Sequence, residues 1–178
     1  MWSKDYKVGG FIMFVPAQLC KEELKKKIIS TWYSLEYQYY WQSYNNEPTF
    51  EENNIYSRQF AFIEDEEITG YFSYSLDNSS NSLYNMGLLS FERPNYAFIK
   101  EVIKHIEWLF DEKIIDRMDF FAYEDNPAIR GYDKMVEKFG GKRVGKFTKS
   151  QRLYDGKLHN TIFYEILRED YENAKRGR

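Results

Sequence analysis

Cysteine and histidine are scarce in this 178-residue sequence, which has one cysteine, Cys20, and two histidines, His105 and His159. A single cysteine forms no internal disulfide, so we expect a reducing compartment such as the cytoplasm. These residues are too few for a typical zinc site, and no metal site is expected. His105 follows Lys104 and is expected on the polar side of its helix. A nucleophile formed by Cys20 and either histidine has no local motif in its favour, and a lone cysteine is usually inert.

The sequence also lacks an apolar run long enough to span a bilayer. Its formal net charge is −3, with acidic and basic residues interspersed, so neither nucleic acid nor a membrane is an expected partner. The basic run at 175–178 is interpreted as a solubilising terminus. The segment 9–16 has features of a leader peptide, but Pro16 interrupts it and Leu19 stands where cleavage needs a small residue, so an opening strand is preferred. No Walker-type phosphate loop or dinucleotide fingerprint is present.

Aromatic residues are abundant instead. The 16 tyrosines and 14 phenylalanines contribute to an aromatic share of 19%, so rings must supply much of the buried area. Residues 1–178 are expected to form a single domain, because a chain of this length buries one sizeable core. Residues 21–44 have helical spacing and end in an aromatic stripe, which is either the wall of a groove or part of the core. Thr49 and Glu52 form a capping pattern that predicts a short helix after Pro48.

The middle of the chain changes to an alternating pattern. Residues 60–76 and 82–91 predict three antiparallel strands, the first two joined by an acidic turn at 64–67. Gly87 lies inside the third strand, where it predicts a bulge or a close approach of the backbone. These strands should form one antiparallel part of a sheet.

The last third alternates helices and strands. An apolar face predicts a helix up to about residue 111, and the strand at 118–123 that follows should pair in parallel. A helix from Asn126 to Phe139, closed by glycines, and a hairpin at 142–167 complete the chain. The expected fold class is therefore α/β, in its α+β form, with a mixed, mostly antiparallel central sheet flanked by helices.

Several motifs occur in a fixed order along this pattern. They are Phe62-Ile63 with Ile68–Tyr71, Asn126–Ala128 leading to Glu137–Gly140, and Tyr154–Lys157 with Tyr164–Leu167. In this order the chain resembles the GNAT superfamily of acyl-CoA-dependent N-acetyltransferases over nearly its whole length. It looks closest to the branch that acetylates the N-termini of ribosomal proteins. The resemblance implies the GNAT fold and acetyl-CoA as cosubstrate.

The loop expected to bind the pyrophosphate departs from the family pattern. Members begin the crossover helix with R-x-x-G-x-G/A, whose glycines let backbone amides approach the phosphates at a helix N-terminus. Here the matching residues are Arg93, Asn95, Tyr96, Ala97 and Phe98, around Pro94, so rings stand at both glycine positions. Either the rings block the phosphates, or the loop opens differently and Arg93 holds them by charge.

The resemblance also implies roles for individual residues. Backbone groups of the third strand would pair with the pantetheine arm, and Asn126 would bond the arm from the far side. Tyr132 would give a proton to the leaving thiolate, and Glu92 or a water held by it would act as base. The cofactor-binding candidates are Leu88, Leu89, Ser90, Phe91, Arg93, Asn95, Tyr96, Ala97, Phe98, Asn126, Ile129 and Arg130.

Two functions remain open at this point. The first is transfer of an acetyl group to a primary amine of a small molecule or peptide N-terminus, and the second is binding of another acyl-CoA, ligand or protein by an inactive GNAT-fold module. In the first case the aromatic and acidic stretch 33–52 would shape the acceptor site, and its carboxylates suggest a cationic acceptor. The closing hairpin offers an edge strand, so a homodimer is also expected as a possible assembly.

Overall fold

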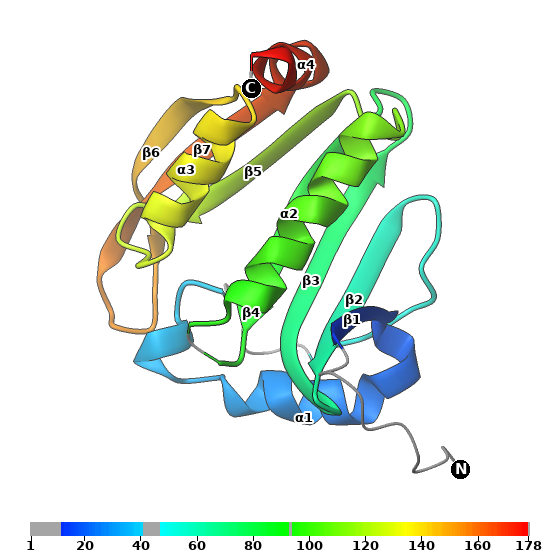
Figure 1. The fold of residues 1–178 in the computed structure, drawn as a ribbon. Coiled ribbons are helices and arrows are strands. Elements are labelled where there is room, and N and C mark those ends of the chain that lie inside the picture. Colours follow the sequence, from blue (N-terminus) through cyan, green and yellow to red (C-terminus); the bar gives the residue numbers. More distant parts are fainter. Residues whose placement is uncertain (1–11, 41–46, 93, 178) are drawn as a thin grey trace.

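The computed structural model describes residues 12–40, 47–92 and 94–177, which form a seven-stranded sheet in the order β1-β2-β3-β4-β5-β7-β6 (Figure 1). The strands are β1 (Ile12–Pro16), β2 (Ser57–Glu64), β3 (Glu67–Asp77), β4 (Ser82–Ser90), β5 (Arg117–Tyr123), β6 (Lys142–Arg152) and β7 (Leu158–Leu167). The helices are α1 (Lys21–Ser30), α2 (Tyr96–Asp111), α3 (Ile129–Lys138) and α4 (Arg168–Arg176), with short 3-10 turns at Ala17–Cys20 and Leu35–Tyr37.

The strand pairing confirms the mixed, mostly antiparallel sheet. Neighbouring described strands pair antiparallel except β4 and β5, which pair in parallel as the crossover helix between them requires. The bulge is also where Gly87 predicted it. Between the pairs Ser73–Gly87 and Ser75–Tyr84, β4 has one residue more than β3, and Asn85 there has a φ of 53°.

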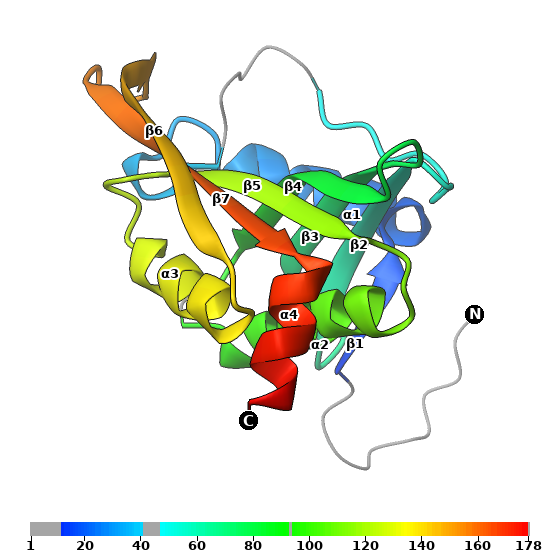
Figure 2. The ribbon, with the colours of Figure 1, turned by 90° about the horizontal axis from the view of Figure 1, so that it is seen from above.

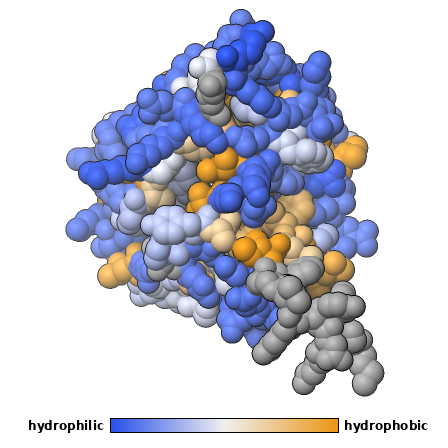
Figure 3. All heavy atoms as spheres, viewed as in Figure 1, coloured by the Kyte–Doolittle hydropathy of each residue, from blue (hydrophilic) through white to orange (hydrophobic). Residues whose placement is uncertain are grey.

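Helices cover both faces of the sheet (Figures 1 and 2). The alternation of β2 shows this directly, because Phe62 packs in the core beneath α2, α3 and α4, whereas its neighbour Ala61 packs with Leu24 and Ile28 of α1. Hydrophilic residues cover much of the surface on the side of α2 and α3 (Figure 3). None of the described helices is both long and apolar enough to cross a membrane.

The predicted helix at 21–44 is wrong beyond its first third, because α1 ends at Ser30. The Thr31 hydroxyl donates to the Ile28 carbonyl at 2.7 Å, and Tyr33 adopts a φ of 59°, which no α-helix accommodates. Residues 41–44 lie outside the described part of the chain. The prediction failed because the aromatic residues of this segment have the spacing of a helix face.

The short helix predicted after Thr49 is also wrong, and residues 47–56 form no helix. The side-chain oxygens of Asn53 and Asn54 instead accept hydrogen bonds from backbone amides of Gln59 and of Tyr56. Such local bonds compete with helix formation. The segment is extended, and the ring of Phe50 in it packs on the sheet.

α2 begins at Tyr96, after the loop that follows β4, and α3 begins at Ile129, after Asn126. Asn95 caps α2 by accepting the Phe98 amide at 2.9 Å. α3 starts at Ile129, later than predicted, because Asn126 forms a turn that accepts the Ala128 amide. Gly140 ends α3 with a φ of 75°, as the glycine pair predicted.

Two features of the C-terminal half differ from the sequence interpretation. Lys175 and Arg176 of the basic run belong to α4, where the Lys175 Nζ donates to Asp111 at 2.6 Å. His105 faces the sheet rather than solvent, because its Nε2 lies 2.8 Å from the hydroxyl of Tyr74 and its ring is edge-on to Phe60. Burial among these rings, with a smaller contribution from Arg58, lowers the pKa of His105 to about 4.

Candidate functional site

The strands β4 and β5 diverge after a short paired stretch. They pair at Ser82–Arg117 and Leu83–Met118, and beyond these residues β4 keeps only β3 as a neighbour and β5 keeps β7. The Phe91 amide donates to the Thr69 carbonyl of β3 at 2.9 Å. Because successive backbone groups of a strand point to opposite edges, the amides of Leu88 and Ser90 face the gap.

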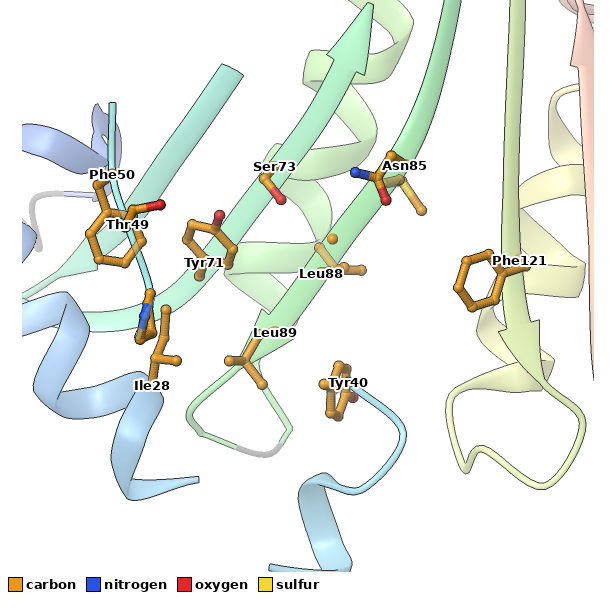
Figure 4. A pocket seen from close by; sticks show the side chains of 13 residues that line it. Ile28, Tyr40, Thr49, Phe50, Tyr71, Ser73, Asn85, Leu88, Leu89 and Phe121 are labelled. Atoms are coloured by element: carbon orange, nitrogen blue, oxygen red, sulfur yellow. The ribbon is translucent and has the colours of Figure 1, made fainter. Parts of the chain in front are cut away.

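Two cavities open at this gap. The first has a volume of about 350 Å³, and the second, between the diverging strands, has a volume of about 90 Å³. Both are lined by Tyr40, Met86, Gly87, Leu88 and Phe121, so they meet across β4. Figure 4 shows Phe121 of β5 pointing across the gap toward β4. The second cavity, called the channel below, therefore adjoins the wider first cavity at the gap.

The described residues that line the wider cavity carry no charged side chain. Its remaining lining is Ile28, Pro48, Thr49, Phe50, Tyr71, Ser73, Asn85 and Leu89. The aromatic part of the stretch 33–52 therefore contributes to the cavity as expected, through Tyr40 and Phe50, but the carboxylates of that stretch do not line it. Burial raises the pKa of Tyr71, although hydrogen bonds from Ser73 and Gln59 oppose the shift.

Asn126 and Tyr132 both line the second cavity, on the side of β5. Asn126 is buried, its amide donates to the Tyr123 carbonyl at 3.0 Å, and its side-chain oxygen accepts the Ala128 amide. The ring of Tyr132 packs edge-on against Phe120 at 5.7 Å. Packing and hydrogen bonds therefore hold both residues in place beside the gap, opposite Leu88.

No family model and no curated protein matches the sequence, but solved structures match the fold. A candidate acetyltransferase from T. thermophilus gives a TM-score of 0.64 at 18% identity, over 99% of this chain and 97% of the other. The microcin C7 self-immunity acetyltransferase MccE, solved with acetyl-CoA and AMP, gives 0.64 at 17% identity, over 88% of this chain and 92% of MccE. RimL, a ribosomal L7/L12 alpha-N-protein acetyltransferase solved with coenzyme A, gives 0.52 at 14% identity, over 63% of this chain and 62% of RimL.

The chain has the fold of the GNAT acetyltransferases. This likeness confirms the fold class expected from the sequence, with the parallel pair of the sheet at the point where its strands diverge. In this GNAT fold, Leu88, Asn126 and Tyr132 meet at one cavity, although they come from three different elements.

In the loop that departs from the GNAT pattern, the two rings at the glycine positions, Tyr96 and Phe98, lie in different environments. The Phe98 ring is fully buried in the core, where a Cβ added to Gly70 would lie 2.8 Å from it, so this ring does not occupy the loop. The Phe98 amide is used by the Asn95 cap. Tyr96 is 79% exposed at the first position of α2. Arg93 lies outside the described residues.

Glu92 does not join Tyr132 in the structure. It lines a separate open hollow at the start of α2, together with Thr69, Pro94, Asn95, Tyr96, Ala97 and the acidic residues Glu64, Asp65 and Glu67. These carboxylates place negative charge beside the first amides of α2, which opposes anion binding there. Among the described residues, Glu92 does not line either of the two gap cavities.

The other predicted site residues take different places. Leu89 lines the wider cavity and Ser90 ends β4. Ile129, at the start of α3, packs against the core, and Arg130 is exposed. Neither of these two lines the gap cavities. Among the described residues, no group of three or more His, Cys, Asp or Glu is arranged to hold a metal ion.

Several residues that line the two cavities were not identified from the sequence. Ser73 and Asn85 come from β3 and β4, and Tyr39 lines the second cavity while its ring lies 6.0 Å from that of His159. An asparagine two residues before Gly87 inside a strand was the available signal, because both residue types are depleted in regular strands. Burial raises the pKa of Cys20, which is consistent with an unreactive thiol.

Proposed function

We propose that this chain transfers an acetyl group from acetyl-CoA to an amine, with the gap between β4 and β5 as the site. The observation that supports it is the divergence of these strands, because it leaves backbone amides of β4 directed into a channel instead of into a neighbouring strand. An extended arm containing amides can bind such an edge as an added strand. The channel is narrow, as the pantetheine arm requires.

The thioester of acetyl-CoA would supply an acyl group that a neutral amine can attack directly. Leu88 and Ser90 would bind the arm through their amides on one side, and Asn126 would bond it from the other. The wider cavity would hold the amine against the gap, so that catalysis is mostly positioning. As the carbon–nitrogen bond forms and the carbon–sulfur bond breaks, Tyr132 would give its proton to the sulfur, and the proton lost by the nitrogen would restore the phenol.

A second candidate is a GNAT-fold module without transferase activity that binds another acyl-CoA, a different ligand or a protein partner. The acidic hollow at the start of α2 favours it, because Glu64, Glu67 and Glu92 line it beside the first residues of the helix, where their charge opposes binding of a pyrophosphate. Loss of phosphate contacts would weaken the binding of acetyl-CoA without closing the channel between the strands.

Release of free thiol from acetyl-CoA, measured with and without a panel of primary amines, distinguishes the two functions. We expect release that depends on the amine and on enzyme concentration, with an acetylated product of about 42 Da added mass, because an acetyl group replaces a hydrogen. Binding of acetyl-CoA without amine-dependent release would support the binding module instead.

A further inference from the structure

The lining of the wider cavity restricts the kind of amine that this proposed transferase accepts. Its described lining residues carry no carboxylate, ammonium, guanidinium or imidazole group. An acceptor amine thus meets a cavity without an opposite charge.

An ammonium ion is costly to move into such a cavity. Taking a charge out of water without a partner carries a large desolvation penalty. At pH 7.5 only about 0.1% of a side-chain amine with a pKa of about 10.4 is neutral, whereas about a quarter of an α-amine with a pKa of about 8 is neutral. The described lining residues also supply no carboxylate or imidazole as a base. A neutral amine is therefore favoured for two reasons: it avoids the desolvation penalty, and it needs no base to remove a proton before it attacks.

Aromatic rings provide the rest of the recognition surface. Tyr40, Phe50, Tyr71 and Phe121 all line the cavity, and the rings of Phe50 and Tyr71 meet edge-on at 5.9 Å (Figure 4). A volume of about 350 Å³ lies within the range of small-ligand pockets. An apolar or aromatic group beside the amine would therefore be buried against these rings.

Neutral hydrogen-bonding groups stand among the rings. Ser73 and Asn85 face each other across the β3–β4 bulge, and Thr49 borders the same cavity (Figure 4). The left-handed φ of 53° fixes Asn85 at the bulge, an unusual position that asparagine tolerates better than most residues. Hydroxyl and amide groups of this kind suit an amide or another neutral polar group of the acceptor.

We infer, resting on the proposed function, that the acceptor is a weakly basic primary amine joined to an apolar or aromatic group and a neutral polar group. An amino-acid amide and the N-terminus of a peptide share this chemistry. Asn85 is then a specificity-determining residue, because it lines the cavity where a negative charge would weaken the preference.

Four amines at pH 7.5 test the two requirements separately. Phenylalaninamide has both the ring and the weakly basic amine, glycinamide lacks the ring, phenethylamine has the ring with a strongly basic amine, and spermidine is a polyamine. We expect kcat/KM for phenylalaninamide to exceed each of the others about tenfold or more, as burial of a ring and avoidance of a buried charge predict. Equal or faster acetylation of phenethylamine or spermidine would overturn the inference. A phenylalanine-initiated tripeptide shows whether peptide N-termini are the source of this chemistry.

Asn85→Asp adds a charge to the cavity with almost no change of shape. It should shift the ratio of kcat/KM for phenethylamine over phenylalaninamide upward about threefold, the size expected for a partly exposed charge pair. Asn78→Asp, in the exposed turn at 78–81 away from the cavity, is the matched control and should leave the ratio unchanged. An unchanged ratio in Asn85→Asp would contradict the role given to Asn85.

Failure of this inference can be told from failure of the proposed function. If acetyl-CoA binds and an amine outside the inferred class is preferred, only the inferred acceptor class is wrong. If acetyl-CoA binds and no amine, inside or outside that class, is acetylated, the binding module is supported and the proposed transfer reaction is wrong. If acetyl-CoA does not bind, the proposed function itself is wrong.

Discussion

Tyr132 is the residue whose role depends most on its position. It stands beside the gap, and its ring is fixed against Phe120. A proton delivered to a leaving thiolate typically contributes about 10²-fold or more to a rate. We expect Tyr132→Phe to lower kcat about 100-fold while the KM for acetyl-CoA changes little, because the ring and its packing remain. Tyr56→Phe, on an exposed tyrosine, is the control, and an unchanged kcat in Tyr132→Phe would remove Tyr132 from the mechanism.

His105 makes stability depend on pH. Its pKa is about 4 in the folded chain because of burial, below the ordinary value of 6.5. Between these values the unfolded chain binds more protons, so the free energy of unfolding should fall as pH decreases from about 6.5 to about 4, by about 2 kcal/mol after allowance for partial exposure.

His105→Gln isolates this effect. The glutamine keeps an acceptor for the Tyr74 hydroxyl but has no ionisable ring. Urea unfolding at pH 7.0 and pH 4.5 should show a smaller loss of stability in the variant than in the wild type. The same loss in both proteins would show that other groups cause the pH dependence.

At the scale of elements, α4 closes the core beneath α2 and α3. Tyr171 stacks on Phe110 with ring centroids 4.7 Å apart, and its hydroxyl donates to Asp111 at 2.9 Å. Tyr171→Ala should lower the free energy of unfolding by about 3 kcal/mol, since it removes a buried ring. Tyr56→Ala, at an exposed tyrosine, should change it by less than about 1 kcal/mol. Similar unfolding midpoints of the two variants in urea would contradict the role of α4.

Elements with a clear period could be predicted from the sequence. The strands from 57 to 90 and the helix α2 were predicted because their apolar residues recur at the period of a strand or a helix. The helix at 21–44 could not be predicted correctly, since Tyr33 needs a conformation set by tertiary packing. α4 was missed because its charged residues hide a single buried residue, Tyr171.

The site could be predicted only in part. Asn126 and Tyr132 followed from the resemblance, and both lie at the gap. Glu92 does not, because the β4–α2 loop carries it to the acidic hollow. Ser73 and Asn85 could not be found by pattern, since a sequence does not show where two paired strands diverge or which of their residues then share a cavity.

At the scale of the whole molecule, the divergence of β4 and β5 leaves the channel between two strands that would otherwise be hydrogen-bonded along their length. The two cavities share lining residues from both strands, including Leu88 of β4 and Phe121 of β5. The proposed transfer reaction, the acceptor class and the role of Tyr132 all depend on this channel binding the pantetheine arm of acetyl-CoA.

Calorimetric titration of acetyl-CoA into the wild type, Asn126→Ala and Asn78→Ala tests that claim most directly. We expect binding of the wild type and of Asn78→Ala at micromolar concentration, and binding at least about tenfold weaker for Asn126→Ala, whose thermal melting verifies that it folds. Absence of wild-type binding at millimolar acetyl-CoA, or equal affinity of all three proteins, would contradict the claim that the gap between β4 and β5 is the acetyl-CoA site.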